Sequence, residues 1–167
     1  MKFKASTVQS VIDSPLGPIM LAASDEGLQG AWFVQGQRHM PDASNWPLSG
    51  QNALLQQTGE ELERYFAGEP VAFDVPLDLD SGTAFQQAVW RALLQIPRGT
   101  TTSYGTLSAR IGKPDAVRAL GAAVGRNPLS IIVPCHRVLG ADGSLTGYAG
   151  GLDRKVALLQ LEGVQLI

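Results

Sequence analysis

The spacing of apolar residues changes partway along this chain of 167 residues. In the first third, short apolar stretches separated by Pro, Gly and Asp follow the pattern of short β-strands. In the second half, apolar residues recur every three or four positions, as in helices that bury one face. This change of period predicts an α+β fold, in which a small N-terminal antiparallel β-rich domain packs on a helical C-terminal domain.

Three short strands are expected near the N-terminus, over residues 8–12, 19–23 and 28–34. The segments between them, Ser14–Pro18 and Asp25–Gly27, are rich in the residues that favour turns. Strands joined by such short turns run antiparallel, so the pattern predicts a meander.

Two longer helices are expected, one in each part of the chain. The first spans residues 54–66, and its glutamates, including Glu61, lie off the apolar face and should be exposed. The second spans residues 85–96, with Thr83 as its cap and Pro97 as its stop.

Pro, Gly and Asp are dense over residues 68–82, where a short strand is also expected at 71–75. We place the domain boundary in this crossing, giving domains of residues 1–80 and 81–167. Charge divides at the same place: the first domain has four Lys or Arg against eleven Asp or Glu, a net charge of −7, and the second has nine against four, a net charge of +5. A basic half beside an acidic half indicates a polyanionic partner such as nucleic acid.

A helix-turn-helix pattern lies within the basic half. Ser103 is placed to cap a helix over 104–111, residues 112–114 form a Gly- and Pro-containing turn, and Asp115 is placed to cap a helix that ends near Gly125. The same pattern occurs in αα-hairpins that bind no nucleic acid, so both interpretations stay open.

One face of the second of these helices carries almost no bulk. The residues expected to point inward are Val117, Leu120 and Val124. Arg118 lies off that line, and the positions beside it on the helix surface are Gly121, Ala122 and Gly125. Such a face suits either a close helix–helix contact or entry into a DNA groove with Arg118 projecting into the duplex.

The single cysteine, Cys135, follows a β-type apolar run at 131–133 and precedes two basic residues, His136 and Arg137. A lone cysteine is usually a small buried hydrophobe. Here the basic neighbours would favour the reactive thiolate. Adjacent side chains of an extended segment point apart, so His136 would act on the sulfur through a water molecule.

The numbers of cysteines and histidines and the lengths of the apolar runs exclude several classes of protein. One cysteine cannot form an intramolecular disulfide, and with two histidines it cannot complete a Cys-rich zinc site. No apolar run approaches the roughly 18 residues of a membrane span, and the basic N-terminus lacks the apolar core of a secretory signal. We therefore expect a cytoplasmic protein with no membrane association, no bound metal and no cofactor.

The segment Pro134–Val138 resembles the active-site motif of the O6-alkylguanine-DNA alkyltransferases. Further segments similar to this family follow in the same order, at Phe85–Trp90, Ser103–Gly105, Val117–Gly121, Asn127–Pro128, Gly147–Gly151 and Leu161–Gly163. The resemblance implies a DNA repair protein that flips O6-alkylguanine out of the duplex and moves the alkyl group irreversibly to its own cysteine, once per molecule. It also implies that residues 1–80 are a ribonuclease-like domain and that residues 81–167 bind DNA and carry the catalytic site.

The resemblance assigns five catalytic residues. Cys135 would accept the alkyl group, His136 would deprotonate it through a water molecule, and Glu162 would orient the imidazole. Tyr104 would hold the base and donate a proton to it, while Asn127 would join the helix-turn-helix to the cysteine loop. Without the resemblance, the sequence favours Glu162 as a helix-terminal surface carboxylate, and it also allows Tyr104 as a partly buried aromatic residue and Asn127 as a helix C-cap.

The substrate-binding residues implied are Tyr104, the carbonyls of Cys135 and Val138, and Tyr148 and Ala149 in a glycine-containing lid. Some family members have serine where this chain has Ala149, so only a backbone contact is expected there. Lys155 lies either near the pocket or in solvent.

For DNA, the resemblance implies that Arg118 fills the gap left by the flipped base. The face made by Gly121, Ala122 and Gly125 would lie against the minor groove. The residues expected to contact phosphates are Arg110, Lys113 and Arg126.

Three other functions compete with this reading. A non-catalytic alkyltransferase-like protein would bind the lesion, but such relatives replace the cysteine that this chain keeps. A helix-turn-helix regulator leaves the Pro134–Val138 segment unexplained, and a thiol hydrolase would need no DNA.

The expected partner is double-stranded DNA carrying O6-alkylguanine, with O4-alkylthymine open as a second substrate. We expect a monomer in solution, and cooperative assembly along DNA stays open.

Overall fold

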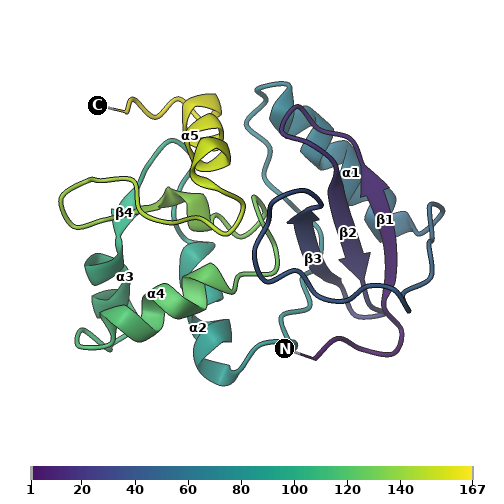
Figure 1. Cartoon of the computed structure of the whole chain (residues 1–167), viewed down its shortest axis with the longest axis horizontal. Coiled ribbons are helices and arrows are strands. Elements are labelled where there is room, and N and C mark those ends of the chain that lie inside the picture. Colours follow the sequence, from purple (N-terminus) through teal and green to yellow (C-terminus); the bar gives the residue numbers. More distant parts are fainter. Residues whose placement is uncertain (1, 167) are drawn as a thin grey trace.

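The computed structural model describes residues 2–166 and has the expected α+β architecture. The sheet and α1 lie on one side of the molecule, and the remaining helices lie on the other (Figure 1). In chain order the elements are β1 (Val8–Ile12), β2 (Ile19–Ala23), β3 (Leu28–Phe33), α1 (Ala53–Phe66), α2 (Ala84–Leu93), β4 (Thr102–Ser103), α3 (Tyr104–Arg110), α4 (Val117–Gly125), the 3₁₀ turn η1 (Cys135–Arg137), β5 (Val138–Leu139) and α5 (Leu152–Leu161).

The three N-terminal strands form the predicted antiparallel meander, in the order β1-β2-β3. Every residue of β2 and β3 is buried, because α1 and the main core cover one face and a small aromatic cluster covers the other. In that cluster Phe3 packs edge to face on Trp32 and Trp46, and the ring-centroid distances among the three are 5.1 to 6.0 Å. Gly30 lies under the Trp32 ring, and a Cβ there would lie 1.9 Å from it.

Helix α1 begins at the cap residue Asn52, whose side chain accepts a hydrogen bond from the backbone N–H of Leu55 at 3.0 Å. The expectation that Glu61 is exposed is wrong, since this carboxylate is buried beside the crossing segment. It accepts hydrogen bonds from Gln57 at 3.1 Å and from the backbone N–H of Asp74 at 3.2 Å. Burial of this glutamate therefore fixes the crossing segment onto α1.

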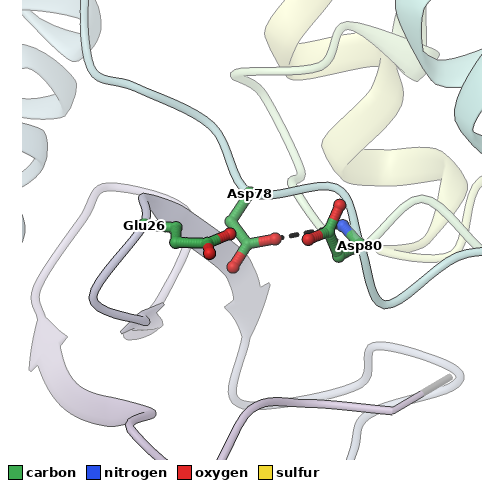
Figure 2. A group of neighbouring side chains, drawn as sticks. All are labelled: Glu26, Asp78 and Asp80. Atoms are coloured by element: carbon green, nitrogen blue, oxygen red, sulfur yellow. Dashed lines mark hydrogen bonds between the residues drawn. The ribbon is translucent and has the colours of Figure 1, made fainter.

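The crossing segment of residues 68–82 contains no strand at 71–75, contrary to expectation, and its one bridge pairs Leu77 with Leu28. Polar anchors hold it in place. Figure 2 shows the side chains of Glu26, Asp78 and Asp80 as neighbours. One carboxylate oxygen of each lies within 4.8 Å of those of the other two.

The ammonium group of Lys4 supplies the positive charge that this acidic cluster needs. It donates to Asp78 at 2.7 Å, to Asp80 at 3.0 Å and also to Glu26. Burial would raise the pKa of Asp78, but hydrogen bonds from Lys4 and Ser24 hold it below its usual value. The cluster therefore ties the N-terminal segment to the crossing.

Helices α2, α3 and α4 pack together, and α3 and α4 form the expected helix-turn-helix. Thr83 and Gln86 form a reciprocal capping box at the start of α2. The indole N–H of Trp90 in α2 donates to the carbonyl of Ala123 in α4 at 2.9 Å. This bond fixes the position of α4 relative to the core.

Two details of α4 differ from expectation. Asp115 does not cap the helix, because the N-cap position falls on Ala116 and no side chain bonds there. Leu120 and Val124 point inward as predicted, but Val117 is 39% exposed. The turn is thus one residue longer than the sequence pattern indicates.

A single apolar core runs through both parts of the chain. The segment after α4 joins β3: the backbone N–H of Ala31 donates to Pro128 at 2.8 Å, and the N–H of Ser130 donates to Ala31 at 3.0 Å. The strand expected at 131–133 is absent, because Ile131 has φ +75° and the chain turns there.

No helix among residues 2–166 has the length and apolar character needed to cross a membrane.

Candidate active site

Cys135 is one of the residues that line a cavity of about 770 Å³, although the residue is only 6% exposed. Cavities of roughly 300–1,000 Å³ hold small organic ligands, so a purine base fits in this volume. Most of the predicted substrate and DNA residues line it: Tyr104, Arg118, Gly121, Ala122, Gly125, Arg126, Tyr148 and Ala149.

Asn127 joins the helix-turn-helix to the cysteine turn. It follows directly after α4, and its side-chain amide donates to the carbonyl of Val133 at 2.8 Å and lies 3.2 Å from the sulfur of Cys135. Its carbonyl oxygen accepts from the backbone N–H of Leu129 at 2.9 Å. One buried amide therefore fixes both the turn and the sulfur.

The expectation that the basic neighbours favour the thiolate is wrong. Burial raises the pKa of the Cys135 thiol to about 11, although the amide of Asn127 and the charge of Lys155 act in the opposite direction. The guanidinium of Arg137 bonds Glu162, and Arg137 is not among the groups that lower the pKa of Cys135. The thiol is protonated at neutral pH and must lose its proton to a base during any reaction.

His136, the next residue along the chain, is the predicted base. It lies in the turn η1 rather than in the expected extended segment, and its Nε2 is 2.8 Å from the carboxylate of Glu162. An ionised carboxylate only accepts hydrogen bonds, so Nε2 carries the proton and Nδ1 carries the lone pair. Nδ1 is buried without a partner among the described residues. Burial lowers the pKa of His136 despite the nearby carboxylate, which leaves the imidazole neutral at pH 7.

Glu162 forms the C-cap of α5 and accepts hydrogen bonds from several side chains. Arg137 donates to it through two nitrogens, at 2.8 and 3.0 Å, and the hydroxyl of Tyr65 donates at 2.6 Å. Burial would raise the pKa of Glu162, but the donors His136, Arg137 and Tyr65 hold it well below its usual range. Sequence reasoning missed Tyr65, which lies 97 residues away on α1 and carries no local signal of this contact.

The lid is held by the N-terminal part of the chain. The carbonyl of Ala149 accepts from the backbone N–H of Arg38 at 2.8 Å, and Arg38 and His39 line the cavity. Gly150 is required for close approach, because a Cβ there would lie 2.7 Å from the ring of Tyr148. Sequence reasoning missed Arg38. The one sequence feature that could have pointed to it is that it is a cation in the otherwise acidic N-terminal half.

Lys155 is fully buried, which excludes the solvated position left open by the sequence. Its ammonium group donates to the carbonyls of Val138 at 2.7 Å and Thr146 at 3.0 Å, and burial lowers its pKa to about 8. Val138 is not among the cavity-lining residues, and its carbonyl keeps one lone pair beside the bond to Lys155. Tyr104 opens α3 and accepts a hydrogen bond from Thr146 at 3.0 Å.

Five of the seven expected DNA residues line the cavity. All four cations are exposed; Arg118 and Arg126 line the cavity, whereas Arg110 and Lys113 lie outside it. A Cβ at Gly125 would meet nothing within 4 Å, and one at Gly121 would meet only the Tyr104 ring at 4.0 Å. The bare face of α4 is thus open to a ligand rather than packed against another helix.

This combination of a helix-turn-helix and a cysteine that lines a cavity beside it is typical of a DNA-binding protein that accepts a chemical group on its sulfur. Residues 84–164 match the 6-O-methylguanine DNA methyltransferase DNA-binding domain, and residues 7–79 match the ribonuclease-like domain of the same proteins. The chain therefore belongs to the methylated-DNA–protein-cysteine methyltransferase family.

Similar relatives and structures agree with this assignment. Methylated-DNA–protein-cysteine methyltransferases from Methanosarcina acetivorans and Mycobacterium tuberculosis are 48% and 51% identical, covering 92% and 90% of this chain and 97% and 89% of theirs. The crystal structure of Mycobacterium tuberculosis OGT in complex with DNA superposes with a TM-score of 0.83 at 49% identity, over 91% of this chain and 90% of that one. The chain is a DNA-binding alkyltransferase for DNA repair that keeps its acceptor cysteine.

Proposed function

We propose that this protein removes the alkyl group from O6 of guanine in duplex DNA and keeps it on Cys135. The observation that carries this proposal is a protonated cysteine that lines a cavity large enough to admit a purine, next in sequence to the neutral His136 and bordered by the open face of α4. An alkyl group on a stacked base cannot reach this sulfur, so the nucleotide must leave the helix. Arg118, at the cavity mouth, fills the gap that it leaves.

The transfer has one bond forming and one bond breaking. The thiol proton passes through a water molecule to Nδ1 of His136, and the sulfur forms a bond to the alkyl carbon. The bond from that carbon to O6 breaks, and its electron pair enters the guanine ring. Guanine takes a proton from the hydroxyl of Tyr104, and proton exchange with solvent restores both residues.

Five residues hold the extruded base in this proposal. Tyr104 and Tyr148 contact its ring, the carbonyls of Cys135 and Val138 accept from its exocyclic amine, and the backbone of Ala149 contacts O6. Each carbonyl has a second lone pair beyond the bond it already accepts.

A thioether has no facile leaving group at neutral pH, and the chain holds no second cysteine to displace it. Each molecule therefore acts once. In this scheme residues 81–167 bind DNA and carry the reaction, residues 1–80 support the lid and the cysteine segment, and the protein acts as a monomer on double-stranded DNA. The observed lid contacts of Arg38 support this division.

Intact-mass analysis tests the proposal. After mixing with a duplex that contains O6-methylguanine, the protein should gain the mass of one methylene equivalent, located on Cys135, in a burst of one equivalent. A Cys135→Ser variant should gain nothing while keeping its affinity for the duplex. Repeated turnover, or a label on another residue, would overturn the proposal; a parallel duplex with O4-methylthymine shows whether that base is also accepted.

A further inference from the structure

A tyrosine from the N-terminal part of the chain bonds the carboxylate that holds the catalytic histidine. Tyr65 lies on α1, is 1% exposed, and donates its hydroxyl hydrogen to Oε2 of Glu162 at 2.6 Å. The same oxygen accepts from Nε2 of His136 at 2.8 Å. Nη2 of Arg137 donates to this oxygen as well, at 3.0 Å, so three donors from both parts of the chain share one carboxylate oxygen.

The carboxylate occupies an unfavourable place for a negative charge. Glu162 is buried at the C-terminal end of α5, where the helix dipole is negative. Among the described residues, the groups that bond it are His136, Arg137 and Tyr65, and Tyr65 alone of these comes from outside the C-terminal half. Burial and the charge of Glu162 raise the pKa of Tyr65 far above its usual value, so its hydroxyl remains a donor throughout the working pH range.

The ring and the hydroxyl of Tyr65 have separable roles. The ring packs against Phe66 and Phe73 at centroid distances of 5.4 and 5.8 Å, and the guanidinium of Arg98 lies 5.5 Å from its centre. Replacement by phenylalanine keeps all of these ring contacts. It removes one hydrogen bond, at the oxygen that also binds the histidine.

We propose that Tyr65 is a positioning residue for alkyl transfer, whose hydroxyl limits the basicity of His136 by sharing Oε2 of Glu162. The inference rests on the proposed function, in which His136 takes the thiol proton. The other charged groups that act on His136 are Arg137 and Lys155, both of which disfavour its protonation, and Arg98 faces the ring of Tyr65. Through this bond, the N-terminal part of the chain adjusts the base used by the C-terminal part.

The direction of the effect follows from the charge on Oε2. Without the tyrosine hydroxyl, the negative charge is shared between His136 and Arg137 alone, and the protonated imidazole gains stability. The pKa of His136 then rises, and a larger fraction of the base is already protonated in mild acid. The acid limb of the pH–rate profile should shift to higher pH.

The test compares single-turnover transfer by the wild type and by Tyr65→Phe across about pH 4.5 to about pH 8, with a methylated duplex in excess. The acid limb of the variant should move upward by roughly 0.5–1 pH unit, with the plateau rate within about twofold of wild type. The matched control is Thr58→Val, which removes another α1 hydroxyl, bonded only to the carbonyl of Leu54, and should leave the limb in place.

A second measurement does not depend on turnover. The chain has two histidines, so NMR titration follows His136 and His39 separately. In Tyr65→Phe the midpoint of His136 should rise while that of His39 stays unchanged. If the variant and the wild type had identical pH–rate profiles and identical His136 midpoints, the inference about Tyr65 would be overturned and the proposed function would stand. A wild type that transfers no methyl group to Cys135 would instead refute the proposed function.

Discussion

At the scale of single residues, the reaction depends on moving one proton from a sulfur that holds it firmly. The pKa of the Cys135 thiol is about 11, and that of His136 is lowered by burial. Above the pKa of His136 the base is neutral, so the wild-type transfer rate should reach a plateau near pH 7, below the pKa of about 8 at which Lys155 begins to lose its charge. Below the pKa of His136 the imidazole gains a proton and the rate should fall.

The variant His136→Ala should lose this plateau. Without a base, transfer depends on the small fraction of free thiolate, which grows tenfold per pH unit until about pH 11. We expect a rate about 10²–10⁴-fold below wild type at neutral pH, rising with unit slope on a logarithmic plot. Single-turnover kinetics followed by intact mass measure it, with Cys135→Ser as the blank. A flat profile in the variant would contradict the assignment of His136 as the base.

Asn127→Ala tests the link between helix-turn-helix and cysteine. The variant leaves the buried carbonyl of Val133 and the backbone N–H of Leu129 without their side-chain partner, at a cost of about 1–3 kcal/mol in the free energy of unfolding. It also removes a donor that lowers the pKa of Cys135, so transfer should slow. Urea unfolding at neutral pH measures the first effect. The exposed Asn45→Ala is the control and should change neither quantity.

Sequence patterns identified most of the residues around the sulfur but not their electrostatics. The motif around Cys135 and the order of the segments after it led to His136, Glu162 and Asn127, and the structure brings all of these together. The thiolate expectation failed because burial of the sulfur depends on the packing of the whole cavity. Tyr65 was missed because nothing in its local sequence distinguishes it from a core aromatic residue.

At the scale of secondary structure, the open face of α4 determines what can approach the cavity. Ala122 is exposed on this face and lines the cavity mouth. Ala122→Leu adds bulk there without disturbing the core, so the free energy of unfolding should change by less than about 0.5 kcal/mol. The affinity for duplex DNA should weaken by about tenfold or more, because the face can no longer enter a groove closely.

Fluorescence anisotropy with a labelled duplex measures that loss. Ala53→Leu makes the same change at an exposed position of α1, remote from the cavity lining, and should bind as wild type does. Equal affinities of the Ala122 variant and the wild type would show that DNA does not lie against α4.

Local patterns predicted the elements that local rules decide. The strands of the meander were predicted from the alternation of side chains and from the turn residues between them. Helices α2 and α3 were predicted from their apolar spacing and from the cap residues Thr83 and Ser103. The run at 131–133 has the composition of a strand but forms a turn, because Ile131 adopts φ +75°, a costly conformation for a β-branched residue. Bonds to Leu129 and Asn127 hold this turn locally, and the bond from Ser130 to Ala31 connects it to β3, which no local window of sequence contains.

At the scale of the whole molecule, the division of charge orients the protein on DNA. The C-terminal half carries a net charge of +5 and the N-terminal half −7, so a duplex should approach the helix-turn-helix side. Each cation that contacts a phosphate releases counterions on binding, and the logarithm of the binding constant then falls linearly with the logarithm of salt concentration.

Lys113 provides the test of this orientation. It is exposed in the turn between α3 and α4, and its ammonium group bonds no residue among 2–166, so Lys113→Ala removes a charge without breaking a contact. Between about 50 and about 200 mM salt, the slope for the variant should be shallower by about 1, with little change in the preference for the methylated duplex. Arg64→Ala removes an exposed cation from α1 in the acidic half and should leave the slope unchanged. If the salt dependence of DNA binding became shallower in the Arg64 variant and stayed unchanged in the Lys113 variant, the duplex would lie on the sheet side. The cavity of Cys135 would then not face the DNA.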